Sequence, residues 1–295
     1  MIDLTPSPLV FSFGPLALHW YGVAYAVGLA AAYLVIRHEA RWRGLDVRLL
    51  PNGMVVVAVA ALIGGRLYHV IDQWQLYRDD PLRIVLPPYS GLGVYGGIIT
   101  GTIAAVLYAR WKHQPFLRWA DAVAPGLFVM QAIARWGNFF NQELYGAPTN
   151  LPWGIAIQCM YRTQGYACPP GSDPAATLGQ HFHPMFLYES ISGLIGALFL
   201  IWLSRRFVNR LRPGDLLLVF FMWYGAVRFV VESLKADNWL FFGVPTAQII
   251  AAITVIGAAV ILAVRHARPP ADEPLDPPDD TVASALEAPG PTPLV

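Results

Sequence analysis

Seven long apolar segments, separated by shorter polar connections, dominate the pattern of hydrophobic and polar residues along the chain. Each segment approaches the roughly 20 residues that an α-helix needs to cross a bilayer. The pattern therefore predicts an all-α polytopic membrane protein with seven transmembrane helices. The predicted spans cover about residues 18–37, 53–71, 92–110, 120–139, 184–204, 214–234 and 244–264.

The composition agrees with a membrane protein. Of 295 residues, 56% are hydrophobic and 13% are charged, and the mean hydropathy is +0.46; soluble proteins average about 25% charged residues. The net charge of +1 and the lack of a basic stripe exclude a nucleic-acid partner. Residues 1–14 lack the basic start of a signal peptide, so we expect the first apolar helix to be retained.

Lysine and arginine residues are divided unevenly between the connections. Thirteen lie in or beside the connections that follow the first, third, fifth and seventh spans, and four lie in the other connections. Cytoplasmic loops carry the excess of positive charge in membrane proteins. We therefore expect an N-terminus outside the membrane and a C-terminus in the cytoplasm.

This orientation places the longest connection, about residues 145–183, outside, where we expect a small ordered cap with short strands. It contains Cys159 and Cys168, and a disulfide is allowed there, although nearness in sequence does not set the geometry. Residues 269–295 contain eight prolines, six acidic residues and no basic residue, which predicts a disordered cytoplasmic tail. Residues 1–268 then form the seven-span domain.

Polar side chains gather at the end of the fourth predicted span, in residues 134–146. Ionisable groups at membrane depth are costly, and they suggest a functional site by default. On a continuing helix Arg135, Asn138 and Gln142 would share one face, where the guanidinium could bind a phosphate through two N–H groups. The alternative is an arginine at a helix end that only extends its charge to the interface.

A second polar pair lies in the sixth predicted span. Arg228 and Glu232 are four residues apart, which places them on one helix face. They could form a simple intrahelical salt bridge. The excess of cations in the spans, with Arg66 and Arg135 in others, favours anion binding.

The polar string closely resembles the signature of the bacterial prolipoprotein diacylglyceryl transferases, Gly-Arg-x-Gly-Asn-Phe-x-Asn-x-Glu-Leu-x-Gly. Only Ala134 departs from it. Further motifs of this family follow in matching order, and together the resemblance covers about residues 10–265. These motifs are Leu18-His19-Trp20-Tyr21-Gly22, Gly64-Gly65-Arg66, His183-Pro184 with Tyr188 and Glu189, and Gly225-Ala226 with Arg228 and Glu232.

Some of these residues have a plain structural alternative. Trp20 is expected in the aromatic belt at the outer interface, whereas the resemblance assigns His19 and Tyr21 to the lipid pocket. Arg66 could bind the phosphate or serve in packing. The segment that begins at His183 is expected to be mainly structural.

Tyr95 is the main departure from the family pattern. The family usually has His-Gly-Gly here, with the histidine proposed as the catalytic base, and this chain has Tyr95-Gly96-Gly97. A tyrosine is almost entirely protonated at neutral pH. We therefore expect Tyr95 to donate a hydrogen bond, while Arg228 or His19 promotes ionisation of the thiol.

The resemblance implies transfer of the diacylglyceryl group of phosphatidylglycerol to the lipobox cysteine of exported prolipoproteins, with a thioether product and release of glycerol 1-phosphate. It implies a bacterial cytoplasmic (inner) membrane enzyme whose active site faces the outer leaflet. The alternative class is a seven-span transporter or channel for an organic anion. That class predicts polar residues spread to both membrane faces, whereas here they gather toward the external half.

The expected partners are phosphatidylglycerol, the membrane and prolipoprotein signal peptides with a lipobox cysteine. No cofactor and no metal are expected, because no nucleotide-binding fingerprint is present and two cysteines rule out a cysteine-rich metal site. The expected catalytic residues are Arg228, Tyr95 and His19, and the expected phosphatidylglycerol-binding residues are Arg135, Asn138, Glu143, Gly146, Tyr21, Glu232 and Arg66.

Overall fold

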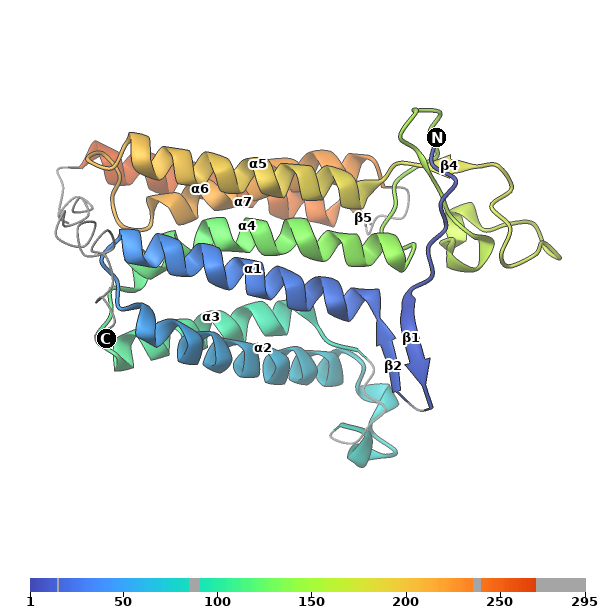
Figure 1. Ribbon diagram of the computed structural model, residues 1–295, viewed down its shortest axis with the longest axis horizontal. Coiled ribbons are helices and arrows are strands. Elements are labelled where there is room, and N and C mark those ends of the chain that lie inside the picture. The colour runs from blue at the N-terminus through green and yellow to red at the C-terminus, as the bar shows by residue number, and fades with distance from the viewer. Residues whose placement is uncertain (15, 85–90, 236–239, 269–295) are drawn as a thin grey trace, which may run out of the picture. The chain divides into compact units, whose positions relative to one another are not determined.

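The computed structural model describes residues 1–14, 16–84, 91–235 and 240–268. The tail predicted to be disordered, residues 269–295, lies outside these residues. Within the described part of the chain, seven α-helices overlap the seven predicted spans (Figure 1). They are α1 (Trp20–Trp42), α2 (Leu50–Asp72), α3 (Val94–Trp111), α4 (Phe116–Phe140), α5 (Met185–Arg206), α6 (Asp215–Ser233) and α7 (Thr246–Ala267).

Five helices are long and apolar enough to cross a membrane, namely α1, α2, α5, α6 and α7. This agrees with a polytopic membrane protein. Helices α3 and α4 are not among these five. Helix α3 is long enough, with 18 residues, but its glycines, threonines and Arg110 lower its mean hydropathy. Helix α4 contains Pro125 and the charged residues Arg118, Asp121 and Arg135.

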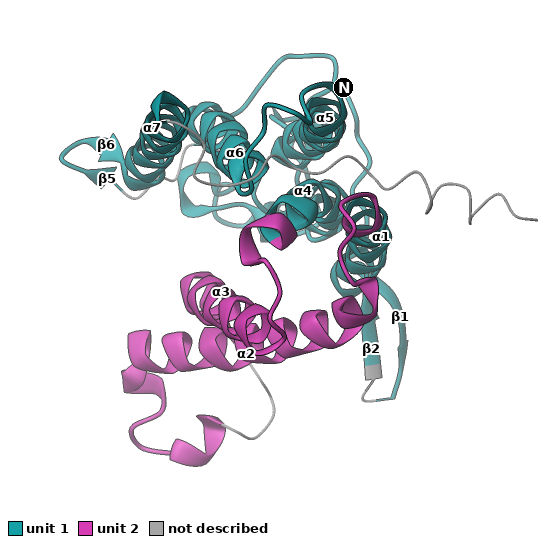
Figure 2. Ribbon diagram, turned by 90° about the vertical axis from the view of Figure 1, so that its left-hand side faces the viewer, with its two compact units in different colours: residues 1–39, 120–295 teal, residues 40–119 magenta. Residues whose placement is uncertain are grey.

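The chain divides into two compact units (Figure 2). The second unit, residues 40–119, contains α2 and α3, which pack along their length. Glycines permit this close packing: a Cβ on Gly64 would lie 2.0 Å from Oγ1 of Thr100, and one on Gly96 would lie 2.2 Å from the carbonyl oxygen of Gly64. Small residues at helix contacts are typical of membrane proteins.

The first unit, residues 1–39 and 120–295, contains the other five helices. Phe128 of α4 is buried against Phe220 of α6, with ring centroids 4.5 Å apart. Helices α4 and α5 approach closely because a Cβ on Gly193 would lie only 2.9 Å from the carbonyl oxygen of Phe128. The hydroxyl of Ser190 also donates to the carbonyl of Ala132, at 2.7 Å. These contacts fix the distance between α4 and α5.

A β-hairpin precedes α1, and the hydropathy pattern did not predict it. Strands β1 (Leu9–Phe13) and β2 (Leu16–His19) pair antiparallel, so the first helix begins at Trp20, two residues later than the predicted start. A second hairpin, β5 (Leu240–Phe241) and β6 (Val244–Pro245), precedes α7. Single-turn 3-10 helices lie in the connections at Val47–Leu49, Trp74–Leu76, Pro81–Ile84, Cys159–Tyr161 and Gln164–Tyr166.

The predicted cap does contain short strands. Strands β3 (Ile155–Ala156) and β4 (His181–Phe182) pair antiparallel, and the N-terminal Ile2 adds a parallel bridge beside β3. Phe182 is fully buried in the small apolar core of the cap. Cys159 and Cys168, for which the sequence allowed a disulfide, are joined by one.

Candidate active site

Four charged side chains from three helices form a connected cluster. Arg135 of α4 binds Glu189 of α5 through two bonds, Nε to Oε2 at 2.8 Å and Nη2 to Oε1 at 3.1 Å. Arg228 of α6 lies 3.6 Å from Oε1 of the same carboxylate, and its Nη2 lies 2.6 Å from Oε2 of Glu232. The helices therefore bring together the two arginines that the sequence singled out in separate spans.

Glu189 is the member that the sequence analysis placed among the mainly structural residues. Its side chain is 5% exposed and interacts with both guanidinium groups. Burying a carboxylate is unfavourable unless it is paired and hydrogen-bonded. A charged residue inside an apolar segment was the available signal, but its partners could not be read from the sequence.

The predicted Arg228–Glu232 salt bridge is present within α6. Both helical neighbours also belong to the larger cluster, since Arg228 reaches Glu189 of α5. The pair is therefore more than a local helix contact. The spacing in the sequence identified these two of the four members of the cluster.

The end of α4 continues the cluster through amide groups. Nη1 of Arg135 donates to Oδ1 of the buried Asn138 at 3.4 Å, and Nδ2 of Asn138 donates to Oε1 of Glu143 at 2.7 Å. Nδ2 of Asn141 also donates to this carboxylate, at 3.4 Å. Arg135, Asn138 and Glu143 thus lie together, as the motif suggested.

Gln142 was expected on the same helix face as Arg135, and this expectation is wrong. Helix α4 ends at Phe140, and Gln142 and Leu144 have φ values of 52° and 54°, in the left-handed region. The side chain of Gln142 donates to the carbonyl of Pro6 at 3.2 Å and to Oε1 of Gln158 at 2.8 Å. Gln142 therefore joins the N-terminal segment to the cap.

Lys235 lies two residues after the end of α6 and extends the cluster. Its Nζ is 3.9 Å from Oε2 of Glu232, and its side chain is 19% exposed. Burial lowers the pKa of Lys235 below the usual lysine value, and the positive charge of Arg228 lowers it further. The sequence analysis counted this residue only as one of the few external positive charges.

The expected site residues at the start of α1 differ in their contacts. Tyr21 packs against α4, because a Cβ on Gly137 would lie 3.0 Å from its Cδ2, and its hydroxyl donates to that of Tyr25 at 3.1 Å. His19 is an exposed residue of β2. Trp20, expected in an aromatic belt, stacks on Phe140 with ring centroids 4.7 Å apart.

Gly146 joins the cap to the end of α6. Its N–H donates to the carbonyl of His183 at 2.9 Å, and the next residue, Ala147, donates to the carbonyl of Leu234 at 2.7 Å. A Cβ on Gly146 would lie 2.8 Å from that carbonyl oxygen. The contacts of Gly146 therefore explain why a glycine fits here, and its expected role in lipid binding stays a prediction.

The segment that begins at His183 has the structural contacts expected of it. Nε1 of Trp153 donates to the hydroxyl of Tyr188 at 2.8 Å, and this hydroxyl lies 3.0 Å from Nδ1 of His183. Burial lowers the pKa of His183. In the neutral imidazole, Nδ1 can then accept a hydrogen bond from the Tyr188 hydroxyl.

The remaining expected residues, Arg66 and Tyr95, belong to the second unit. Arg66 donates to the carbonyls of Ile84, Arg83 and Gly91 at 3.0, 2.6 and 3.3 Å. These bonds favour the packing alternative for Arg66, because its N–H groups hold the connection between α2 and α3. Tyr95 lies in the first turn of α3 and is 59% exposed.

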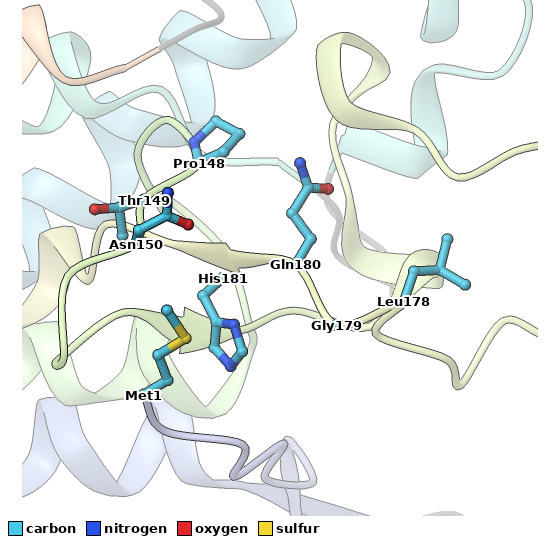
Figure 3. A pocket seen from close by; sticks show the side chains of 8 residues that line it. All are labelled: Met1, Pro148, Thr149, Asn150, Leu178, Gly179, Gln180 and His181. Atoms are coloured by element: carbon cyan, nitrogen blue, oxygen red, sulfur yellow. The ribbon is translucent and has the colours of Figure 1, made fainter.

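A cavity of about 630 Å³ opens in the cap (Figure 3). The lining of the cavity contains no residue of the charged cluster. It consists of Met1, Pro148, Thr149, Asn150, Leu178, Gly179, Gln180 and His181.

Within the described part of the chain, no group of three or more His, Cys, Asp or Glu residues could hold a metal ion.

A bundle of apolar helices with a cluster of arginines and carboxylates at their ends defines a polytopic membrane protein with a charged site among its helices. The family model for prolipoprotein diacylglyceryl transferases matches residues 8–264, and the chain belongs to this family. The resemblance drawn from the motifs is thus confirmed, and so is the class of transferase, in preference to a transporter or channel.

Individual relatives match over most of their length. A phosphatidylglycerol–prolipoprotein diacylglyceryl transferase of Chloroflexus aggregans is 34% identical over 304 residues, which cover 95% of this chain and 97% of the relative. The proteins of the same name from Nostoc sp. and Halalkalibacterium halodurans are each 35% identical, over 88% and 90% of this chain and 88% and 89% of the relative.

Proposed function

We propose that this protein transfers the diacylglyceryl group of phosphatidylglycerol to the lipobox cysteine of exported prolipoproteins. The thiol sulfur forms a thioether with the glycerol carbon, and glycerol 1-phosphate leaves. This is the first step of lipoprotein maturation. The observation that supports it is the cluster of Arg135, Glu189, Arg228 and Glu232 at the ends of three packed helices.

The reaction breaks a carbon–oxygen bond next to phosphate, so negative charge develops on the leaving phosphate. Groups that are already in place and aimed at developing charge are usually the largest source of catalysis. Arg135 and Arg228 remain charged at any working pH and have planar arrays of donors that match phosphate oxygens. In our proposal both bind the phosphate, and Arg228 is the catalytic residue.

The carboxylates hold these guanidinium groups before the lipid binds. Glu189 interacts with both arginines, while Glu232 holds Arg228. A guanidinium has five N–H donors, so each arginine keeps donors for an incoming phosphate beyond those used in the pair. Asn138 and Glu143 hold the end of α4, and Tyr21 packs beside it.

The acceptor must become a thiolate before it can attack. A nearby cation lowers the pKa of a cysteine thiol from about 8.5, and the cluster supplies such cations. From the resemblance we assign Tyr95 the role of a hydrogen-bond donor in place of the family histidine, and His19 a supporting role in ionisation. Gly146 completes the proposed phosphatidylglycerol site, whereas Arg66 holds the connection between α2 and α3.

We further propose seven spans with the N-terminus outside and the active site toward the outer leaflet of the bacterial cytoplasmic membrane. The division of positive charges supports this orientation. The disulfide between Cys159 and Cys168 supports an external cap, because disulfides persist in oxidising compartments. Acyl chains could remain in the bilayer while the head group reaches the cluster.

The decisive experiment incubates purified protein with phosphatidylglycerol and a lipobox peptide and measures the peptide mass. We expect a diacylglyceryl increment on the cysteine, and no increment on a peptide with serine in its place. Phosphatidylethanolamine replaces phosphatidylglycerol as the control for the donor. Absence of any increment, together with efflux of an organic anion from vesicles that contain the protein, would support a transporter instead.

A further inference from the structure

We propose that Lys235 is the residue that accepts the proton of the cysteine thiol. This inference rests on the proposed function, since it names the proton acceptor of the same reaction. Lys235 lies two residues after the end of α6, beside the carboxylate of Glu232 that holds Arg228.

The backbone around Lys235 is fixed on two sides. The carbonyl of the preceding Leu234 accepts a hydrogen bond from Ala147 of the cap, at 2.7 Å, and the N–H of Lys235 donates to the carbonyl of Glu232 at 3.2 Å. The lysine therefore lies where the cap meets the end of α6. A peptide that approaches from outside the membrane would meet Lys235 next to the proposed phosphate site.

The charged groups that act on the amine come from three helices. Glu232 and Arg228 belong to α6, Glu189 to α5 and Arg135 to α4. The two arginines disfavour the ammonium form, and the two carboxylates favour it. Burial is the largest influence and acts in the same direction as the arginines, so the pKa of Lys235 is lowered.

The other members of the cluster are poorly suited to accept this proton. A guanidinium cannot lose its proton in a protein, so neither arginine can serve. Glu189 and Glu232 pair with Arg135 and Arg228, and protonation of either carboxylate would weaken the ion pairs that position the guanidinium groups. A partly buried lysine with a lowered pKa is a known type of general base.

The proposed step balances in protons and electrons. The neutral amine of Lys235 takes the S–H proton, and the sulfur electron pair forms the new bond to the glycerol carbon. The carbon–oxygen bond breaks, and its electron pair leaves on the phosphate of glycerol 1-phosphate. The ammonium of Lys235 then gives its proton to this phosphate or to water, which restores the neutral amine.

The test uses Lys235→Arg, which keeps a long basic side chain but removes the proton acceptor, because a guanidinium stays protonated. The chain has one other lysine, Lys112 at the end of α3, and Lys112→Arg is the matched control. Full-length proteins are assayed in phosphatidylglycerol vesicles with two lipobox peptides, one with cysteine and one with selenocysteine. A selenol is already ionised at neutral pH, so it needs no proton acceptor.

General-base catalysis typically contributes about 10²- to 10⁴-fold in rate. We expect Lys235→Arg to lower kcat for the cysteine peptide by roughly 100-fold or more, and to remove the ascending limb of the pH–rate profile that Lys235 gives the wild type. With the selenocysteine peptide, the variant should stay within a few-fold of the wild type. Lys112→Arg should behave like the wild type with both peptides.

Two results would overturn the assignment. Equal losses with both peptides would show that Lys235 binds or shapes the site without accepting the proton. An unchanged pH–rate profile in an active Lys235→Arg protein would exclude it directly. Failure of the proposed function is distinguishable, because the wild type itself would then modify neither peptide.

Discussion

Arg135 and Glu189 form a buried ion pair between α4 and α5, with Nε and Oε2 separated by 2.8 Å. The side chains are 19% and 5% exposed. Removing one partner of a buried pair is strongly destabilising, because the remaining charge loses its compensation. This pair therefore links the stability of the bundle to the charge of the proposed phosphate site.

Glu189→Gln should destabilise the protein. Loss of this carboxylate leaves two guanidinium groups facing an amide, and breaking a buried pair costs about 3–5 kcal/mol. Glu143→Gln is the comparison, because Glu143 is exposed and a glutamine oxygen can still accept the hydrogen bonds from Asn138 and Asn141. Unfolding in mixed micelles measures the difference. Equal stabilities of the two variants would show that Glu189 contributes little to the fold.

Arg135→Lys should impair transfer although it keeps the charge. A lysine cannot reproduce the planar donor array that contacts Glu189 and, in our proposal, also the phosphate. Loss of a hydrogen bond made in the transition state costs about 2.7–4 kcal/mol, or roughly 10²- to 10³-fold in kcat. Steady-state kinetics with phosphatidylglycerol and a lipobox peptide measure this loss. Near-normal kinetics would indicate that Arg135 is only an interfacial anchor.

Tyr95→Phe should lower the rate of transfer without shifting the pH–rate profile. In our proposal the Tyr95 phenol acts as a hydrogen-bond donor and exchanges no proton with the thiol. Tyr95→His should retain substantial activity, because an imidazole also donates. The profiles are measured with folded, full-length protein. If Tyr95→Phe abolished the ascending limb of the profile, Tyr95 would be the general base and the assignment of Lys235 would be wrong.

The stability of the protein should fall as the pH decreases below about 6.5 because of His183. Burial lowers its pKa below the ordinary value near 6.5, so the unfolded chain binds more protons at this position than the folded protein does. Unfolding then becomes easier as the pH falls through this window. Melting temperatures between pH 7.5 and 5 should decline less steeply in His183→Asn. Identical slopes would show that His183 does not cause the decline.

Cysteines placed at Ser7 and Ser284 should react from opposite sides of the membrane. The two native cysteines are joined in a disulfide, so they give no background with thiol reagents. In intact spheroplasts an impermeant reagent should label the cysteine at position 7 alone, and permeabilised cells should label both. Labelling of both positions from outside would contradict seven spans.

The sequence by itself determined the helices and the local part of the site. Each apolar segment is long enough to require a helix in a bilayer, where every backbone polar group must be satisfied within the segment. The Arg228–Glu232 pair was also predictable, because residues four apart on a helix are neighbours whatever the rest of the fold does. The motif at residues 134–146 identified the polar end of the fourth helix, because its residues follow one another in the sequence.

Only the tertiary structure decided how these parts meet. Arg135 and Glu189 are 54 residues apart, and their contact depends on how closely α4 and α5 pack, which small residues such as Gly193 control. Gln142 leaves the predicted face because the chain turns after Phe140 and its amide binds the N-terminal segment and the cap. Such partners are set by packing between distant segments, which the local periodicity of the sequence does not encode.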